Sequence, residues 1–227
     1  MRFAVIEGLD GSGKSTQIKM LKRYLEEKEI PYKYLHFPRT NAPVYGELIA
    51  RFLRGELGNI SEVDPWLVAL IYAGDRNEAK EMIRNWIKEG YFVLVDRYVI
   101  SNIAFQCAKL HSLQRREDLK KWILSLEYDH HNLPVPDVNI FLDVPFQFTQ
   151  TQLSKNRKGE DRDYLNGASD IHEQNLDFQS QVREVYMSLR GEKGYNVLHC
   201  YDQYGTMLPP DQIFQKIITI LFGHEEY

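Results

Sequence analysis

Residues 7–16 read EGLDGSGKST, and this stretch decides the fold. From Gly8 to Ser15 it matches the pattern G-x-x-x-x-G-K-[ST] without a mismatch. The apolar run Phe3–Ile6 precedes the motif, and Lys14–Lys28, with helical periodicity, follows it. This order of strand, glycine-rich turn and helix brings backbone N–H groups and a helix N-terminus to face one anion. The sequence therefore predicts a loop that holds the phosphates of a nucleoside triphosphate.

Each residue type in this loop has a defined chemical task. The glycines let successive backbone N–H groups point at one phosphate. Lys14 can reach the β- and γ-phosphates, and the Ser15 hydroxyl is suited to ligate Mg²⁺. We therefore expect ATP to bind here together with Mg²⁺. The phosphate-binding residues that the motif predicts are Gly8, Asp10, Gly11, Ser12, Gly13, Lys14, Ser15 and Thr16.

Apolar runs and helical patterns alternate along the rest of the chain. The predicted strands are Phe3–Ile6, Pro31–Phe37, Tyr91–Val95, Val138–Leu142 and Tyr195–His199. The predicted helices are Lys14–Lys28, Val44–Arg54, Pro65–Lys88, Leu113–Leu126 and Pro210–Phe222. Five strands separated by helices indicate an α/β fold in three layers, with a parallel sheet flanked by helices. We expect a single domain over residues 1–227.

The composition is that of an ordinary globular protein, with 43% hydrophobic and 26% charged residues. A net charge of −4 gives no general attraction to nucleic acid or to anionic membranes. The two cysteines, Cys107 and Cys200, lack the spacing of a metal site or redox pair. No signal-peptide pattern follows Met1, and no apolar run approaches the roughly 20 residues of a membrane span. We expect a soluble, cytoplasmic protein without nucleic-acid or membrane partners.

Three further segments supply groups for a second substrate, namely 37–39, 72–76 and 96–106. Ligands of open α/β sheets bind outside the carboxyl ends of the strands, so these segments are expected to meet beside the phosphate loop. Arginines bind a phosphate in a fork, and aromatic rings and amides bind a base. The candidates are Arg39 and Arg97 for a monophosphate, Tyr72 and Phe105 for the faces of a base, and Asn102 and Arg76 for its polar edge.

Other proteins with such a loop are disfavoured by what the sequence lacks. A GTPase needs an N-K-x-D guanine motif after a later strand, and the sequence contains none. Motor and transport ATPases are usually larger or built of several modules. A small kinase remains, which needs the acceptor site described above.

Together these motifs resemble those of the thymidylate kinase family. The resemblance covers essentially the whole chain and rests on EGLDGSGKSTQ at 7–17, FPR at 37–39, YAGDR at 72–76, DRYVISNIAFQ at 96–106, LPVPD at 133–137 and FLDV at 141–144. It implies the reaction ATP + dTMP ⇌ ADP + dTDP with Mg²⁺, which serves dTTP synthesis. It further implies a P-loop NTPase fold with a mobile lid at about 154–170 and a homodimer.

The resemblance also implies a role for particular residues. Asp10 is expected to bind the sugar 3′-hydroxyl, Tyr72 to stack on thymine, and Phe105 to crowd the 2′ position. The dTMP-binding residues that it implies are Asp10, Phe37, Arg39, Tyr72, Arg76, Arg97, Ser101, Asn102, Phe105, Tyr164 and Gln179. The implied metal ligands, partly through water, are Ser15 and Asp96. The implied catalytic residues are Lys14, Arg97, Arg157, Arg162 and Asp10.

Gly11 directs the search for a catalytic cation to the lid. Some family members carry arginine directly after the loop aspartate, whereas members with glycine there place arginine in the lid. This chain has Gly11, and its lid segment contains Arg157 and Arg162. Two alternatives stay open from the residues alone. One is a kinase for a deoxynucleoside or another deoxynucleotide, and the other is a P-loop protein that binds nucleotide as a regulator without turnover.

We predict that Arg157→Ala or Arg162→Ala lowers the turnover number far more than the affinity for ATP. The reason is that a lid cation stabilises charge that develops in the transition state. Steady-state kinetics with ATP as the varied substrate measure both quantities. If both variants keep turnover within about threefold of the unchanged protein, the lid arginines do not have this role.

Overall fold

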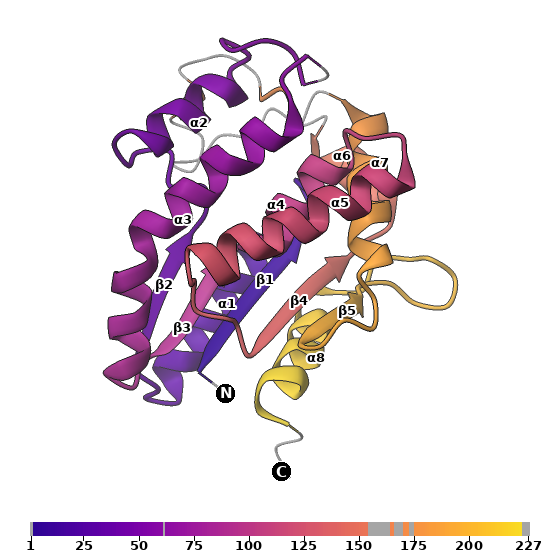
Figure 1. The fold of residues 1–227 in the computed structure, drawn as a ribbon. Helices are drawn as coiled ribbons and strands as arrows, with labels where there is room; N and C mark the ends of the chain where they lie inside the picture. The colour runs from indigo at the N-terminus through magenta and orange to yellow at the C-terminus, as the bar shows by residue number, and fades with distance from the viewer. Residues whose placement is uncertain (1, 61, 154–163, 166–169, 173–174, 224–227) are drawn as a thin grey trace.

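A five-stranded parallel sheet forms the centre of the molecule, with the strand order β2-β3-β1-β4-β5 (Figure 1). The computed structural model describes residues 2–60, 62–153, 164–165, 170–172 and 175–223. The strands are β1 (Phe3–Gly8), β2 (Tyr32–His36), β3 (Phe92–Asp96), β4 (Val138–Asp143) and β5 (Tyr195–His199). All five predicted strands and the predicted parallel sheet are confirmed.

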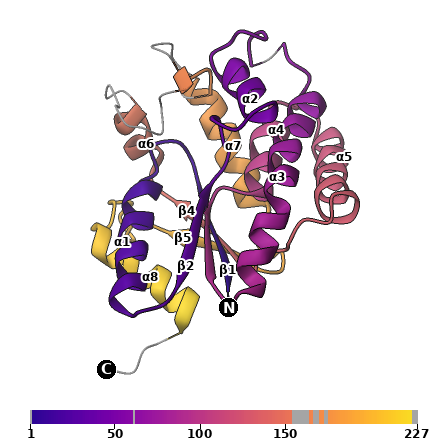
Figure 2. The same ribbon diagram turned by 90° about the vertical axis from the view of Figure 1, so that its left-hand side faces the viewer.

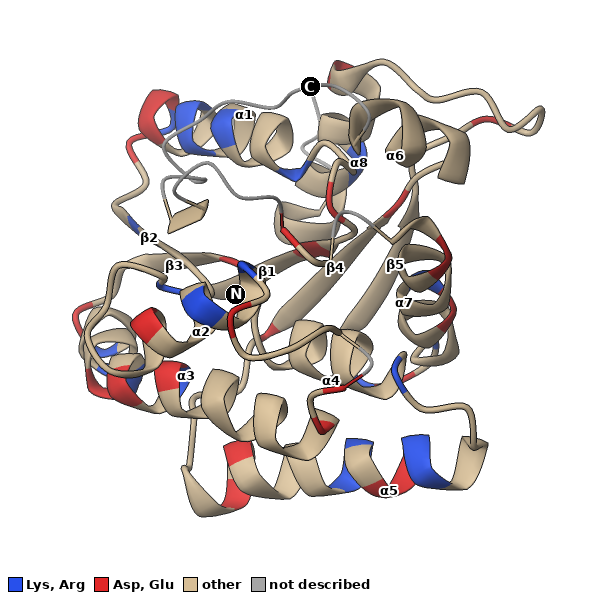
Figure 3. Cartoon of the chain, turned by 90° about the horizontal axis from the view of Figure 1, so that it is seen from above, with Lys and Arg blue, Asp and Glu red and all other residues tan. Residues whose placement is uncertain are grey.

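Helices cover both faces of the sheet. They are α1 (Lys14–Glu27), α2 (Tyr45–Leu53), α3 (Pro65–Lys88), α4 (Val99–Cys107), α5 (Leu113–Leu124), α6 (Phe146–Leu153), α7 (Leu176–Ser188) and α8 (Pro210–Phe222). One face carries α1 and α8, and the other carries α3, α4, α5 and α7 (Figures 2 and 3). In the described part of the chain, no helix is long and apolar enough to cross a membrane.

The side chains of β1 alternate between the two cores. Phe3 and Val5 pack in the cluster beneath α3, α4 and α7, while Ala4 and Ile6 pack in the cluster beneath α1 and α8. All four side chains are buried, because a parallel strand covered by helices on both faces has no solvent side. The continuous apolar run in the sequence therefore corresponds to a central strand.

The structure contains three helices, α4, α6 and α7, that the periodicity of the sequence did not predict. In α4, residues Val99 and Ser101–Cys107 are buried, so the helix lacks the polar face that produces an amphipathic pattern. The predicted helix Leu113–Leu126 is also different at its end, since α5 stops at Leu124 and a π-helical segment, η1 (Ser125–His130), continues it. The predicted start of the helix at Pro65 is confirmed. The Asp64 carboxylate caps α3 there by accepting from the backbone N–H of Trp66 at 2.8 Å.

The topology brings the phosphate loop beside the start of α4. In the parallel register Ile6 of β1 lies opposite Asp96 of β3, and the Arg97 N–H donates to the Ile6 carbonyl at 3.0 Å. The loop after β1 and the turn after β3 consequently leave the same edge of the sheet side by side. This edge contains the cavity described next.

Candidate active site

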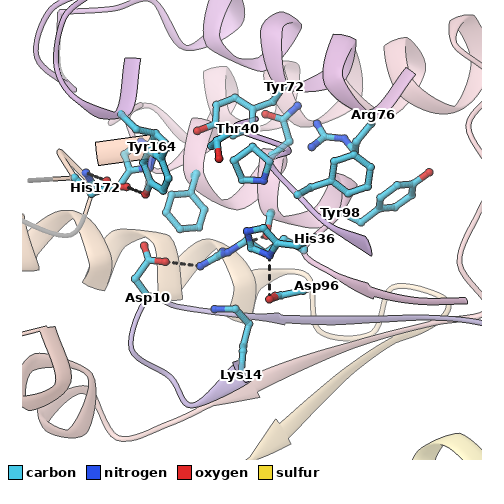
Figure 4. A pocket seen from close by; sticks show the side chains of 18 of the residues that line it. Asp10, Lys14, His36, Thr40, Tyr72, Arg76, Asp96, Tyr98, Tyr164 and His172 are labelled. Carbon is cyan, nitrogen blue, oxygen red and sulfur yellow. Dashed lines mark hydrogen bonds and ion pairs between the residues drawn. The ribbon is translucent and has the colours of Figure 1, made fainter. Parts of the chain in front are cut away.

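A cavity lies at the carboxyl edge of the sheet and is lined by segments far apart in the sequence (Figure 4). They come from the phosphate loop and the start of α1, the ends of β2 and β3 with the turns that follow them, helices α2, α3 and α4, and residues Tyr164, Asp170 and His172. The lining residues are Asp10, Gly11, Lys14, Ser15, His36, Phe37, Pro38, Thr40, Leu53, Tyr72, Arg76, Asp96, Arg97, Tyr98, Ser101, Asn102, Phe105, Gln106, Tyr164, Asp170 and His172. The structure thus brings residues proposed for donor and acceptor into one space.

Most of the predicted acceptor residues line this cavity. They are Asp10, Phe37, Tyr72, Arg76, Arg97, Ser101, Asn102, Phe105 and Tyr164. Arg39 and Gln179 are not among the lining residues. In the phosphate loop, Gly8, Ser12, Gly13 and Thr16 also lie outside this lining.

Gly8 and Gly11 of the phosphate loop lie where a side chain would meet close neighbours. A Cβ on Gly8 would lie 2.6 Å from the Ser12 Oγ, so the Ser12 side chain would have to move. Gly11 has φ +75°, and a Cβ there would lie 3.1 Å from the Cβ of Gln152 in α6. Both the backbone conformation and the contact with α6 therefore exclude a larger residue directly after Asp10 without rearrangement.

Lys14 folds back over the loop and is buried. Its Nζ donates to the carbonyl oxygens of Gly8 at 3.1 Å and Leu9 at 2.8 Å. Burial and, to a smaller extent, the charge of Arg97 lower the pKa of Lys14 to about 8, although Asp96 and other carboxylates oppose the shift. A bound phosphate would favour the charged form of this ammonium group. Binding of a phosphate would therefore keep Lys14 fully protonated.

Arg97 and Asp10 form an ion pair at the junction of the two halves of the cavity. The Arg97 Nη2 donates to Asp10 Oδ1 at 2.6 Å, and Gln179 Nε2 donates to Asp10 Oδ2 at 3.0 Å. Burial alone would raise the pKa of Asp10, but Arg97 and then Lys14 outweigh it and hold that pKa at about 2. Gln179, predicted to bind dTMP, therefore contacts Asp10 from behind the cavity wall, and its dTMP contact stays a prediction.

The backbone of Arg97 is strained, with φ +65° at a residue other than glycine. Glu7 of β1 stabilises the turn from below, because its carboxylate accepts from the backbone N–H groups of Tyr98 at 2.9 Å and Ser101 at 3.3 Å. It also accepts from the hydroxyls of Ser101 and Tyr186. Burial raises the pKa of Glu7 in spite of these donors. The start of α4, and with it Arg97, is thereby fixed to the strand that enters the phosphate loop.

Arg39 has protein partners rather than a place in the cavity lining. Its Nε donates to Asp75 Oδ1 at 2.8 Å, and its Nη2 donates to the Asp75 carbonyl at 2.8 Å and to Glu78 at 3.2 Å. Asp75 is fully buried, and it also accepts from the Arg39 backbone N–H. These contacts fix the turn after β2 to α3. The phosphate-binding role of Arg39 stays a prediction.

Ser15 and Asp96 provide a fitting place for Mg²⁺. Both line the cavity, and Asp96 Oδ1 is buried without a hydrogen-bond partner in the described part of the chain. Burial tends to raise the pKa of Asp96, but His36, whose Nδ1 lies 3.0 Å from Oδ2, and Lys14 lower it below its ordinary value. An ionised carboxylate and a hydroxyl suit a Mg²⁺ ion that takes its other ligands from phosphates and water. Among described residues no group of three or more His, Cys, Asp or Glu could hold a metal ion alone.

The base end of the cavity contains a residue that the sequence analysis did not select. Gln106 is 1% exposed, lines the cavity, and neither atom of its amide has a partner among the described residues. It lies four residues after Asn102 in α4, so a helix assignment would have put both amides on one face. His36 and His172 also line the cavity, and no sequence signal pointed to them.

The predicted lid lies mostly outside the described residues. Arg157 and Arg162 both belong to the part that the structure does not describe. Tyr164 is described, and its hydroxyl donates to Asp170 Oδ2 at 2.7 Å while its carbonyl accepts from Arg54 at 2.7 Å. Its dTMP contact and the catalytic roles of the two lid arginines stay predictions.

Comparisons with known proteins identify the family. A family model described as "Thymidylate kinase" matches residues 6–205. The chain belongs to the thymidylate kinase family. It is 35% identical to a probable thymidylate kinase from Pyrobaculum aerophilum over 200 residues, which cover 87% of this chain and 88% of that relative. It is 29% identical to a thymidylate kinase from Mycobacterium tuberculosis over 187 residues, which cover 82% of this chain and 85% of the relative.

The fold of this chain is also similar to that of a solved structure. Thymidylate kinase from Candida albicans aligns with a TM-score of 0.69 and 24% sequence identity, over 97% of this chain and 90% of that one. At this identity the likeness concerns the fold. The thymidylate kinase family and its P-loop fold, both predicted from the sequence, are therefore confirmed.

The ion pair between Asp10 and Arg97 makes the free energy of unfolding depend on pH in the acid range. The folded-state pKa of about 2 lies below the ordinary 3.8, so the folded protein binds this proton less tightly than the unfolded chain. The resulting stability is present above about pH 4 and is lost as the pH falls towards 2. We predict that Asp10→Asn lowers the free energy of unfolding by about 2 kcal/mol at pH 6, and that the difference shrinks towards zero near pH 2.

Urea unfolding of both proteins across this pH range measures the difference. Asp211→Asn, at an exposed position in the first turn of α8, serves as the control. A difference between Asp10→Asn and the unchanged protein that stays constant from pH 6 to pH 2 would contradict the ion-pair account.

Proposed function

We propose that this chain transfers the γ-phosphoryl group of ATP to dTMP and releases ADP and dTDP. The observation that carries the proposal is the single cavity in which the Lys14 end of the phosphate loop meets Arg97 and the base-reading pair Arg76 and Asn102. Family membership supports the same reaction. A donor site alone would need none of the groups at the base end.

The chemistry requires alignment and charge neutralisation more than proton transfer. The attacking group is a phosphate oxygen that is already ionised, so no strong general base is needed. Two anions must approach in line, and Lys14 and Arg97 lower the repulsion between them. When bound between Ser15 and Asp96, partly through water, Mg²⁺ would neutralise charge on the β- and γ-phosphates.

The remaining residues of the cavity orient the acceptor. Asp10 holds Arg97 at 2.6 Å and has a second oxygen beside the expected position of the sugar. Phe105 lies under the guanidinium of Arg97, with the guanidinium carbon 5.0 Å from the ring centre. This ring closes the wall where a 2′-hydroxyl would project, which favours a deoxyribose. Tyr72 supplies a ring at the base end, with its hydroxyl pKa raised by burial and so kept neutral.

The finer features of the family are part of the same proposal. We propose one domain over residues 1–227, Mg²⁺ as the cofactor and a homodimer in the cytoplasm. Leu67 and Leu70 of α3 are 59% and 43% exposed, and a helical dimer face would bury them. The net charge of −4 supports the absence of a nucleic-acid partner.

A substrate panel tests the proposed function. The purified protein is incubated with Mg-ATP and, separately, with dTMP, dUMP, dGMP, dCMP or thymidine, and ADP formation is followed. We expect dTMP to be the best acceptor, dUMP to follow and thymidine to be inert. Lys14→Met should reduce turnover by about 100-fold or more, because it removes a cation that neutralises transition-state charge. Lys19→Met, on the exposed side of α1, is the matched control.

Two outcomes would decide for the alternatives. Activity on thymidine without activity on dTMP would establish a deoxynucleoside kinase. Tight ATP binding without transfer to any member of the panel would establish a nucleotide-binding regulator.

A further inference from the structure

Glu127 lies behind the base end of the cavity and contacts both residues of the base-reading pair. It belongs to η1, is fully buried and is absent from the cavity lining. Arg76 and Asn102, which do line the cavity, are 1% and 2% exposed. The carboxylate thus lies where it can act on a ligand only through these two side chains.

Arg76 is bound to Glu127 in a fork. Its Nε donates to Oε2 at 2.5 Å and its Nη2 donates to Oε1 at 2.7 Å, so the plane of the guanidinium is fixed. Burial tends to lower the pKa of Arg76, and Glu127 more than restores it. The third nitrogen, Nη1, makes no hydrogen bond in the described part of the chain. Arg76 therefore has an N–H donor left for a ligand.

The same carboxylate fixes which way the amide of Asn102 points. Its Nδ2 donates to Glu127 Oε1 at 2.9 Å and to the Ala69 carbonyl at 3.0 Å. Both partners can only accept, so the reverse orientation would place oxygen against oxygen. The Oδ1 atom is buried and has no partner among the described residues. Asn102 therefore has an acceptor left for a ligand.

An acceptor beside a donor selects one kind of base edge. Thymine and uracil present an imide, in which the N3–H donates and the neighbouring O4 accepts. Cytosine presents the opposite polarity, with an unprotonated N3 and an amino group at the same positions. A buried site built to bond one polarity strongly rejects the other, because its polar groups are left unpaired.

We propose that Glu127 is a positioning residue that sets this polarity and thereby restricts pyrimidine acceptors to those with an imide N–H. The inference rests on the proposed function, since it concerns the acceptor of that reaction. Its ligand contact is made by Arg76 and Asn102, and Glu127 acts through them.

The local backbone supports the same assignment. Glu127 is brought to this position by the π-helical segment η1, where the His131 N–H donates to the Leu126 carbonyl at 2.8 Å and the Leu133 N–H to the Glu127 carbonyl at 2.9 Å. A π-helical turn replaces the regular α-helical hydrogen bonds by longer-range ones, and such turns are frequent at functional sites.

Two variants of Glu127 test the inference. Glu127→Gln keeps the shape but adds N–H donors, which favours rotation of the Asn102 amide. Glu127→Asp keeps the charge but is shorter, so it cannot hold both partners. For each variant we expect KM for dTMP to rise about tenfold or more, with KM for ATP within about twofold. The ratio of kcat/KM for dTMP over dCMP should fall by about tenfold or more, most in Glu127→Gln. Glu117→Gln on the exposed side of α5 is the control.

A purely structural role would give a different result. It would lower kcat for every acceptor alike and leave the ratio of dTMP to dCMP unchanged, which would overturn the inference. An unchanged KM for dTMP in both variants would overturn it as well. If the unchanged protein is inactive on dTMP, the proposed function itself is contradicted. The two failures are therefore distinguishable.

A second measurement needs no variant and therefore does not depend on folding. The unchanged protein is assayed with dUMP, dCMP and N3-methylthymidine monophosphate. The imide in dUMP should be accepted, whereas the other two should have kcat/KM at least about 100-fold below that of dTMP. Values for dCMP or the N3-methyl compound within about tenfold of dTMP would overturn the assigned polarity.

Discussion

The parallel pairing of β1 with β3 is the constraint on which the site depends. It places the phosphate loop, which leaves β1, beside the Asp96–Arg97 turn, which leaves β3. Glu7 strengthens this junction, because one carboxylate on β1 accepts two backbone N–H groups from the start of α4. The distance between the phosphate loop and the start of α4 is therefore set by the sheet and by one buried carboxylate. Packing of α4 in the core keeps that distance from varying.

The buried cations of the site differ in how they are paired. The cations Arg76, Arg97 and Arg39 each have a carboxylate partner within hydrogen-bonding distance, namely Glu127, Asp10 and Asp75. Lys14 instead donates to two backbone carbonyls, and its pKa is lowered to about 8. A buried cation without a carboxylate at hydrogen-bonding distance is the group that gains most from an incoming phosphate. The difference in pairing thus separates Lys14, which we propose binds the donor, from the arginines that we propose shape the acceptor site.

Local sequence patterns predicted the phosphate loop and all five strands because the signals for both are short and continuous. They did not predict α4, whose buried residues on every side remove the helical period, and Gln106 was missed with it. The role of Glu127 was beyond reach, because it pairs with Arg76 across 51 positions and depends on a π-helical turn. The contacts of Arg39 with Asp75 were hidden for the same reason, since an arginine after a strand gives no sign of its partner. Pairings of this kind arise only when the sheet and helices have assembled.

The central claim is that one cavity holds the donor and the acceptor in line. A crystal structure of the protein with dTMP and a non-hydrolysable ATP analogue tests it most directly. The account predicts the acceptor phosphate beside Arg97, the γ-phosphate beside Lys14 and the pyrimidine N3–H at Asn102 Oδ1. Binding of dTMP outside this cavity, or with its base turned away from Asn102 and Arg76, would contradict it.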